Sequence, residues 1–163
     1  MGGLNHDFLL ISVKENPSYG WENYFNRDEA IQIHDDILSY MADTIKWIPS
    51  YNPSKKCPYN GLCWYGPTII KQEGATIAQK VFSLWAELFS CGPTVLKLTG
   101  NFSCQLDNDP FKDGYERIVP NSSGYEKLII NRNELVDKLK LLSSYAQKIQ
   151  DSYGQFYILH MGI

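Results

Sequence analysis

Hydrophobic residues near the C-terminus recur at intervals of three and four, the spacing that places side chains on one face of an α-helix. We therefore predict a helix that begins after Asn131, with Glu134 completing its capping pair, and that ends at Gly154. The apolar positions that define this helix are Leu135, Leu139, Leu142, Ala146, Ile149 and Tyr153.

Two further segments show the same helical spacing. Residues 75–91 follow it up to Gly92 and Pro93, which together form a stop signal. Residues 27–46 also follow it, after a start at Asn26 that resembles a capping box. We predict a helix in each segment. The apolar positions of the earlier one are Ala30, Ile33, Ile37, Met41 and Ile45.

Several runs have the alternation or the residue types that are typical of β-strands. Residues 8–13 and 155–161 are apolar runs, and we expect the second of them to insert into a sheet. Residues 94–102 alternate, and Gly100 within them permits a β-bulge. Further strands are predicted at residues 104–106, 115–119 and 125–130, the last two joined by a turn at residues 120–124.

The segment between residues 47 and 67 contains four prolines and two glycines, which predict a long loop. Long loops in compact domains are commonly functional, and aromatic side chains are favoured anchors at protein interfaces. Trp64 and Tyr65 are our candidate anchors, although both could instead pack beneath the loop. The aromatic residues of the segment are Trp47, Tyr51, Tyr59, Trp64 and Tyr65.

These elements predict the fold class. The order of strands and helices favours an α+β fold in which about three helices pack on one face of a mostly antiparallel sheet. The 163 residues are one domain's length, and 44% of them are hydrophobic, which is enough for a core. We therefore expect a single domain over residues 1–163, without internal repeats.

The net charge of -3 argues against a protein that neutralises phosphates, so we expect no direct contact with nucleic acid. The first residues lack the basic and apolar parts of a secretory signal, and no stretch is apolar enough to span a membrane. We expect a cytoplasmic protein without a membrane partner.

The four cysteines do not have the spacing of a metal site. Cys57 and Cys63 are separated by five residues, more than zinc knuckles use, and neither Cys91 nor Cys104 belongs to a ligand pair. Phosphate-binding loops, dinucleotide fingerprints and nucleophile elbows are also missing from the sequence. We therefore expect no metal and no cofactor.

Three histidines limit the acid–base chemistry available near neutral pH. His6 is expected in a fraying terminus, His34 on the solvated face of the helix predicted at residues 27–46, and His160 in the core or at the edge of the sheet. We expect no catalytic residues. An alternative is a small-ligand-binding or enzymatic α+β domain that uses His160, a nearby carboxylate and Thr99.

Acidic residues are concentrated in two regions. Between residues 15 and 43 there are seven acids against Arg27, and the loop at residues 101–116 contains four more. The second group lacks the regular spacing of a calcium-binding loop. Both regions could be ordinary solvated surface, or they could form a docking surface for a basic partner. The candidate docking residues are Asp28, Glu29, Asp35, Asp36, Asp107, Asp109, Asp113 and Glu116.

Three short segments in the C-terminal part of the chain are similar to bacterial immunity proteins of polymorphic-toxin and contact-dependent growth inhibition systems, in particular to the family called immunity protein 70. The segments are Leu96-Lys-Leu-Thr-Gly-Asn-Phe102, Asn133-Glu-Leu-Val-Asp-Lys-Leu139 and Phe156-Tyr-Ile-Leu-His-Met-Gly-Ile163. The resemblance implies a protein without catalytic activity that binds a cognate toxin domain, often a nuclease, and blocks its active or substrate-binding surface. It carries no interface residue over to this chain.

An acidic domain without a catalytic constellation agrees with such an inhibitor of a basic nuclease. The resemblance implies a toxin C-terminal domain as partner, and the acidic residues and the two aromatic anchors are our hypothesis for the contact surface. A structural subunit of a larger assembly is a third class, which would expose a broad apolar patch.

Overall fold

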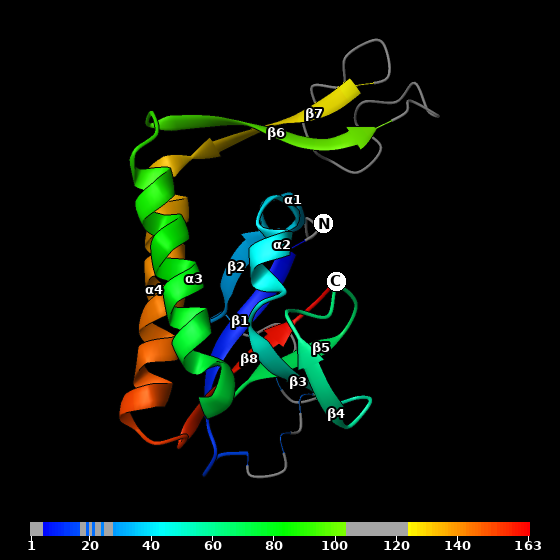
Figure 1. The fold of residues 1–163 in the computed structure, drawn as a ribbon, viewed down its shortest axis with the longest axis vertical. Coiled ribbons are helices and arrows are strands. Elements are labelled where there is room, and N and C mark those ends of the chain that lie inside the picture. Colours follow the sequence, from blue (N-terminus) through cyan, green and yellow to red (C-terminus); the bar gives the residue numbers. More distant parts are fainter. Residues whose placement is uncertain (1–4, 17–18, 20, 22–23, 25–27, 104–123) are drawn as a thin grey trace.

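A six-stranded sheet organises the chain in the computed structural model, which describes residues 5–16, 19, 21, 24, 28–103 and 124–163 (Figure 1). Its strands are β1 (Asn5–Ser12), β2 (Ile31–His34), β3 (Pro49–Asn52), β4 (Cys57–Asn60), β5 (Pro67–Ile70) and β8 (Phe156–Met161). Their order in the sheet is β2-β1-β8-β5-β3-β4, and all neighbouring pairs are antiparallel. The final strand therefore lies inside the sheet, as its apolar sequence predicts.

Four helices within the described residues cover one face of this sheet. The long helices α3 (Gln72–Ser90) and α4 (Arg132–Asp151) pack against each other, and the short helices are α1 (Asp35–Tyr40) and α2 (Ala42–Ile45) (Figure 1). Phe82 and Leu139 are fully buried in the core that the helices form with Phe8 and Ile158 of the sheet. The Asn131 side chain caps α4 by accepting a hydrogen bond from the backbone N–H of Glu134, as predicted. The α+β fold class is confirmed.

A second, smaller core lies on the opposite face of the sheet. Leu9, Tyr157 and Leu159 are buried there together with Tyr24, which comes from the segment that joins β1 to β2. The sheet is thus covered on both faces, which explains why Tyr157 to Met161 of β8 are all buried instead of alternating with exposed residues.

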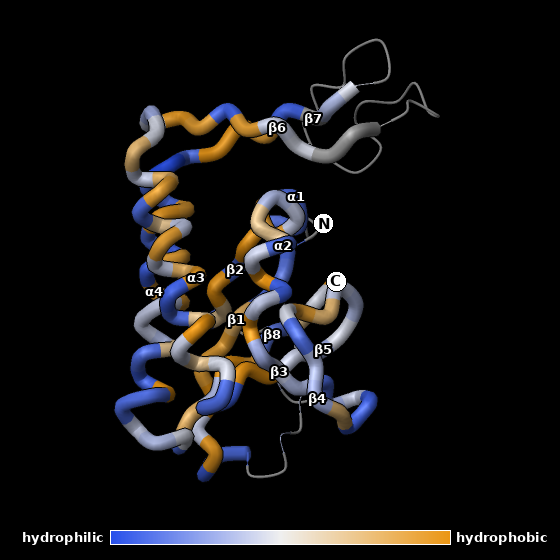
Figure 2. The backbone as a smooth tube through the Cα atoms, in the orientation of Figure 1, coloured by the Kyte–Doolittle hydropathy of each residue, from blue (hydrophilic) through white to orange (hydrophobic). Residues whose placement is uncertain are grey.

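Strands β6 (Val95–Ser103) and β7 (Gly124–Asn131) form a separate two-stranded ribbon, which follows α3 and precedes α4 in the chain and extends from one end of this helix pair (Figure 1). Hydrophobic and hydrophilic residues alternate along it (Figure 2). Leu96 and Leu128 point to the main core and are buried, whereas Val95 and Ile129 are exposed. The strand pairing shifts register between Thr99 and Phe102, which confirms the predicted bulge at Gly100.

The helix predicted over residues 27–46 is wrong in its first part, whereas α1 and α2 lie in its second part. Its first part is strand β2, where buried Ile31 and Ile33 alternate with Gln32 and His34, and only then does α1 begin. Ile33 and Ile37 are four residues apart, a spacing that fits both the two-residue period of a strand and the 3.6-residue period of a helix. In the structure Ile33 lies in β2 and Ile37 lies in α1. Residues 31–34 form a strand because they pair with β1 in the antiparallel sheet.

The long loop predicted over residues 47–67 is also wrong in part, because β3, β4 and the start of β5 lie in it. Prolines are tolerated at the first residue of a strand and on edge strands. Pro49 and Pro67 are the first residues of β3 and β5, and Pro58 belongs to the edge strand β4. The strand predicted at 125–130 is confirmed as β7. The strands predicted at 104–106 and 115–119 lie outside the described residues, as does the turn predicted at 120–124 except for Gly124, the first residue of β7.

None of the described helices combines the length and the apolar character that crossing a membrane requires.

Candidate functional site

Two histidines form a hydrogen-bonded pair in the interior of the sheet. His6 lies on β1 and His160 on the neighbouring strand β8, and Nδ1 of His6 is 2.8 Å from Nε2 of His160. Both residues are 0% exposed. A buried imidazole needs a partner for each ring nitrogen, so the remaining nitrogen of each ring identifies the next member of the site.

A carboxylate and a hydroxyl complete the chain of hydrogen bonds. Asp35, the first residue of α1, places Oδ1 3.1 Å from Nε2 of His6. Thr68 of β5 places Oγ1 3.4 Å from Nδ1 of His160, and the same oxygen accepts a hydrogen bond of 2.7 Å from the backbone N–H of Cys63. We call Asp35, His6, His160 and Thr68 the histidine chain.

Neutral rings satisfy every group in the histidine chain. The Thr68 hydroxyl donates to His160 Nδ1, His160 Nε2–H donates to His6 Nδ1, and His6 Nε2–H donates to the Asp35 carboxylate. A proton added to His6 reverses the direction of the central hydrogen bond, whereas two charged rings would turn N–H toward N–H across 2.8 Å. The pair therefore accommodates one extra proton at most.

Burial keeps both rings neutral. Loss of hydration lowers the pKa of His6 below its usual value of 6.5, although the hydrogen bond and the charge of Asp35 oppose that shift. Burial lowers the pKa of His160 well below 6.5, and the neighbouring His6 lowers it further. Asp35, whose side chain is 18% exposed, is the member of the chain that reaches solvent.

Aromatic rings close the sides of the pair. The Trp64 ring meets the edge of His6 at a centroid distance of 5.0 Å, and Phe8 lies 4.9 Å from His160. The chain of bonds could relay a proton between Asp35 and Thr68, but no substrate atom reaches either imidazole in this closed arrangement. The histidine chain is therefore an enclosed set of hydrogen bonds that connects β1, β8, β5 and α1.

The three histidine predictions have different outcomes. His160 lies in the core, as predicted, but the expectation that His6 frays is wrong, because β1 begins at Asn5 and carries His6 into the sheet. In a strand, residues two positions apart lie on the same face, so the apolar residue Phe8 could have indicated that His6 is buried as well. His34 is not on a solvated helix face: it ends β2 and caps α1, with Nδ1 accepting from the Asp36 backbone N–H.

The structure brings His160 to a carboxylate only through His6, and it separates His160 from Thr99, which lies on the β6–β7 ribbon. Thr68 takes the place that we expected for Thr99. Sequence reasoning missed Thr68 because it lies just after the predicted loop at residues 47–67, in a short strand, β5, for which no element was predicted.

The acidic candidate residues do not form one face. Asp28 and Glu29 are exposed in the turn before β2, and Asp35 and Asp36 follow the opposite end of that strand. The last two are partly buried, and each contacts a histidine: Asp35 contacts His6 at 3.1 Å, and Asp36 contacts His34 at 3.5 Å. Asp107, Asp109, Asp113 and Glu116 lie outside the described residues.

The two aromatic candidates have opposite environments. Trp64 packs against His6 and the main core, whereas its neighbour Tyr65 is 80% exposed. The backbone on both sides of Tyr65 is held by the end of the chain, because Ile163 N–H donates to Trp64 O and Gly162 N–H donates to Gly66 O. Tyr65 therefore projects from a backbone that is fixed at both neighbouring residues.

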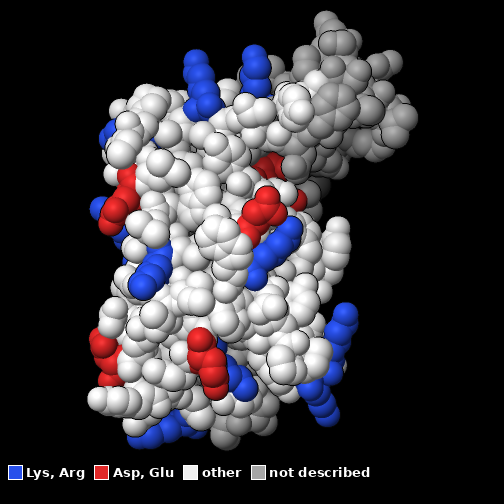
Figure 3. Space-filling view, viewed as in Figure 1, with Lys and Arg blue, Asp and Glu red and all other residues white. Residues whose placement is uncertain are grey.

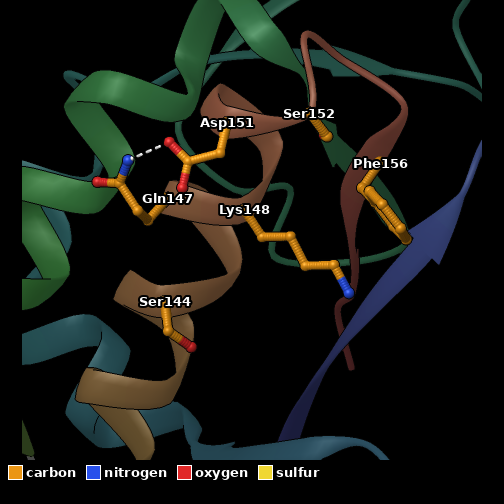
Figure 4. A pocket seen from close by; sticks show the side chains of 6 residues that line it. All are labelled: Ser144, Gln147, Lys148, Asp151, Ser152 and Phe156. Atoms are coloured by element: carbon orange, nitrogen blue, oxygen red, sulfur yellow. Dashed lines mark hydrogen bonds between the residues drawn. The ribbon is translucent and has the colours of Figure 1, made fainter.

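A shallow pocket lies at the end of α4, away from the histidine chain. Lys148 and Phe156 form one side of it, with the ammonium 4.3 Å from the ring centroid (Figure 4). Gln147 donates a hydrogen bond of 2.8 Å to Asp151 on the other side (Figure 4). These side chains are paired with one another, so the pocket offers an incoming ligand few unused polar groups.

Within the described ranges, no group of three or more histidine, cysteine, aspartate or glutamate residues is placed to hold a metal ion, and Cys57, Cys63 and Cys91 are free thiols. Comparison of the chain with protein-family models, with curated proteins and with solved structures finds no match.

Proposed function

We propose that this chain is a cytoplasmic immunity protein, which binds a cognate bacterial toxin domain and blocks its active or substrate-binding surface. The toxin domain is a nuclease with a basic substrate-binding surface. The proposal starts from the resemblance of three C-terminal segments to the immunity protein 70 family, and it is supported by the surface that surrounds Tyr65.

The exposure of Tyr65 on a fixed backbone is the observation that carries the proposal. Tyrosine side chains that are exposed before binding and held in place lose little conformational entropy when a partner buries them. Tyr65 is 80% exposed, and the residues on either side of it accept backbone hydrogen bonds of 3.0 and 2.9 Å from Ile163 and Gly162. It has the properties of an interface anchor.

Acidic residues of α1 share a neighbour with the loop that carries this anchor. Trp64 and Asp35 both contact His6, so the loop that carries Tyr65 and the first turn of α1 meet at the same imidazole. The first turn of α1 contains Asp35 and Asp36. Carboxylates on an element that adjoins the anchor loop fit a toxin surface that binds phosphate groups, because opposite potentials accelerate association.

We expect Tyr65→Ala to weaken toxin binding by about 30-fold, corresponding to ~2 kcal/mol for a central aromatic anchor. The free energy of unfolding should change by less than about 0.5 kcal/mol, because the side chain is exposed. The first step is to sequence the genes adjacent to the gene for this chain. The probe is the C-terminal domain of a toxin encoded there, inactivated for purification. Isothermal titration calorimetry gives the affinity, and growth of cells that express the active toxin gives protection.

Tyr153→Ala is the matched control, because Tyr153 is also an exposed tyrosine but follows α4, where no contact with the histidine chain exists. It should bind and protect like the unchanged protein. Equal affinities of the two variants would remove Tyr65 from the interface. A toxin domain that neither binds the unchanged chain nor is neutralised by it would refute the proposed function.

A further inference from the structure

Helix α3 is apolar on two faces. One face is buried in the main core, and the other carries large aliphatic side chains that the core does not cover: Ile77, Leu84 and Leu88 are 38%, 60% and 59% exposed. A helix on the surface of a domain normally has one apolar face, with charged and polar residues opposite to it. The buried residues of the core face are Ala75, Ala78, Phe82, Ala86 and Phe89.

Helix α4, which packs beside α3, has the ordinary arrangement. It exposes one large aliphatic residue, Leu141, and it carries charged residues along its whole length. In α3 only Glu73, Lys80 and Glu87 are charged. Charged side chains are correspondingly few over α3 on the face of the molecule that Figures 1 and 3 show. The charged residues of α4 are Arg132, Glu134, Asp137, Lys138, Lys140, Lys148 and Asp151.

The outward residues of α3 have the spacing of a coiled-coil interface. Ile77, Val81, Leu84 and Leu88 follow one another at intervals of four, three and four, and Cys91 adds an interval of three. Intervals that alternate between three and four allow a helix to pack its side chains between those of a second helix with the same spacing. Val81 is buried against the main core, and the other four residues are exposed. We call these five residues the α3 stripe.

The two charged residues beside the α3 stripe have opposite signs. Lys80 and Glu87 are the only charged residues between residues 74 and 91. They are one heptad apart, so both lie along the same side of the stripe. Both are exposed, and none of the ion pairs found among the described residues includes either of them. Each is therefore available to a charge on a partner.

We propose that the α3 stripe binds the α3 stripe of a second copy of this chain, with the two helices antiparallel around a two-fold axis. Val81 then lies opposite Leu84 of the second copy, and Ile77 lies opposite Leu88 of the second copy. Antiparallel helices bring the same flank of both stripes together, so Lys80 faces Glu87 of the second copy, and the two-fold axis repeats this ion pair. The stripe does not include Tyr65, and the inference does not depend on the proposed function.

Other occupants fit the α3 stripe less well. A parallel second helix would place Lys80 opposite Trp85, so that the two opposite charges would not meet. A basic partner would meet Lys80 as well as Glu87. Helices that lie on anionic membranes carry several basic residues beside their apolar face, whereas α3 contains one. An antiparallel second copy uses both charges and the apolar residues together.

Sedimentation of the full chain tests the dimer. The stripe is only two heptads long, so we expect a weak dimer that dissociates between about 200 and 1 µM. Leu84→Glu should abolish it, because two carboxylates would be buried near its centre. Leu141→Glu on α4 is the matched control, because Leu141 is also an exposed leucine of a long helix but lies outside the stripe. It should dimerise like the unchanged chain, and circular dichroism checks that both variants fold.

Exchange of the two charges tests the partner and the orientation. Lys80→Glu or Glu87→Lys alone places like charges opposite each other twice, and each should weaken the dimer about tenfold at low ionic strength. An equal mixture of the two variants restores opposite charges at both positions, so its heterodimer should be about as tight as the unchanged dimer.

The proposal is overturned if the unchanged chain stays monomeric over the whole concentration range, or if Leu84→Glu and Leu141→Glu dimerise equally. It is also overturned if the mixture of charge variants associates no better than either variant alone. Toxin binding that Leu84→Glu abolishes and Leu141→Glu retains would assign the stripe to the toxin instead.

Discussion

Gly162→Ala is expected to lower the free energy of unfolding by about 2–4 kcal/mol, because the added methyl group has no space. A Cβ atom at this position would lie 2.2 Å from the carbonyl oxygen of Trp64 and 2.6 Å from that of Cys63. Both atoms belong to the backbone, so no side-chain rotation relieves the overlap. The segment that follows β8 must separate from the loop that carries Tyr65.

That separation should also affect binding. Gly162 N–H donates to Gly66 O at 2.9 Å, and Ile163 N–H donates to Trp64 O at 3.0 Å, and the overlap works against both bonds. If Tyr65 is the anchor for the toxin, Gly162→Ala should weaken toxin binding even though it removes no contacting side chain. Urea unfolding followed by tryptophan fluorescence gives the stability, and calorimetry with the toxin domain gives the affinity.

Ile163→Ala is the control, because it truncates the neighbouring side chain and leaves both backbone hydrogen bonds in place. Its unfolding free energy should change by less than about 1 kcal/mol. An unchanged stability of Gly162→Ala would contradict the close approach of the two backbone segments, whatever happens to binding.

The elements that the sequence predicts correctly are those whose periodicity extends over many residues. Helix α4 keeps its apolar spacing for five turns and has a capping asparagine, Asn131, so neither its type nor its start is ambiguous. Strand β8 is recognisable because Tyr157–Leu159 are apolar without alternation, which indicates burial on both faces. Such signals are local, and no tertiary contact is needed to interpret them.

The histidine chain depends on contacts that no local pattern contains. His6 and His160 are separated by 154 positions, and they meet only because β1 pairs with β8. Asp35 and Thr68 join them through the short elements α1 and β5. The first lies within a helix that was predicted too long, and the second begins at the last residue of the predicted loop, where no strand was predicted. An error in two short elements was therefore enough to conceal the site, although the fold class was correct.

Acidification is expected to destabilise the protein through the buried histidines. In the folded chain the pKa values of His6 and His160 lie below 6.5, so the unfolded chain takes up protons at a higher pH than the folded chain does. The stabilisation that comes from the neutral pair is complete above pH 6.5 and is lost as the pH falls below it. While both histidines are protonated only in the unfolded chain, the loss reaches about 2.7 kcal/mol per pH unit.

The groups around the pair set the size of this loss. Asp35 favours the charged form of His6 by hydrogen bond and charge, and Asp7 favours it by charge, whereas His34 and burial disfavour it. For His160, burial and His6 both disfavour the charged form, and its other partner, Thr68, is uncharged. His160 should therefore contribute more of the pH dependence than His6.

Unfolding in urea at pH 7.5 and pH 5.5 tests this order with glutamine variants, which keep a hydrogen-bonding side chain and remove the titrating group. His160→Gln should reduce the loss of stability between the two pH values more than His6→Gln does, and the double variant should remove most of it. His34→Gln, which leaves both buried rings in place, should retain it. If the double variant lost as much stability on acidification as the unchanged chain, carboxylates elsewhere would be responsible. The histidine chain would then serve only to join the strands.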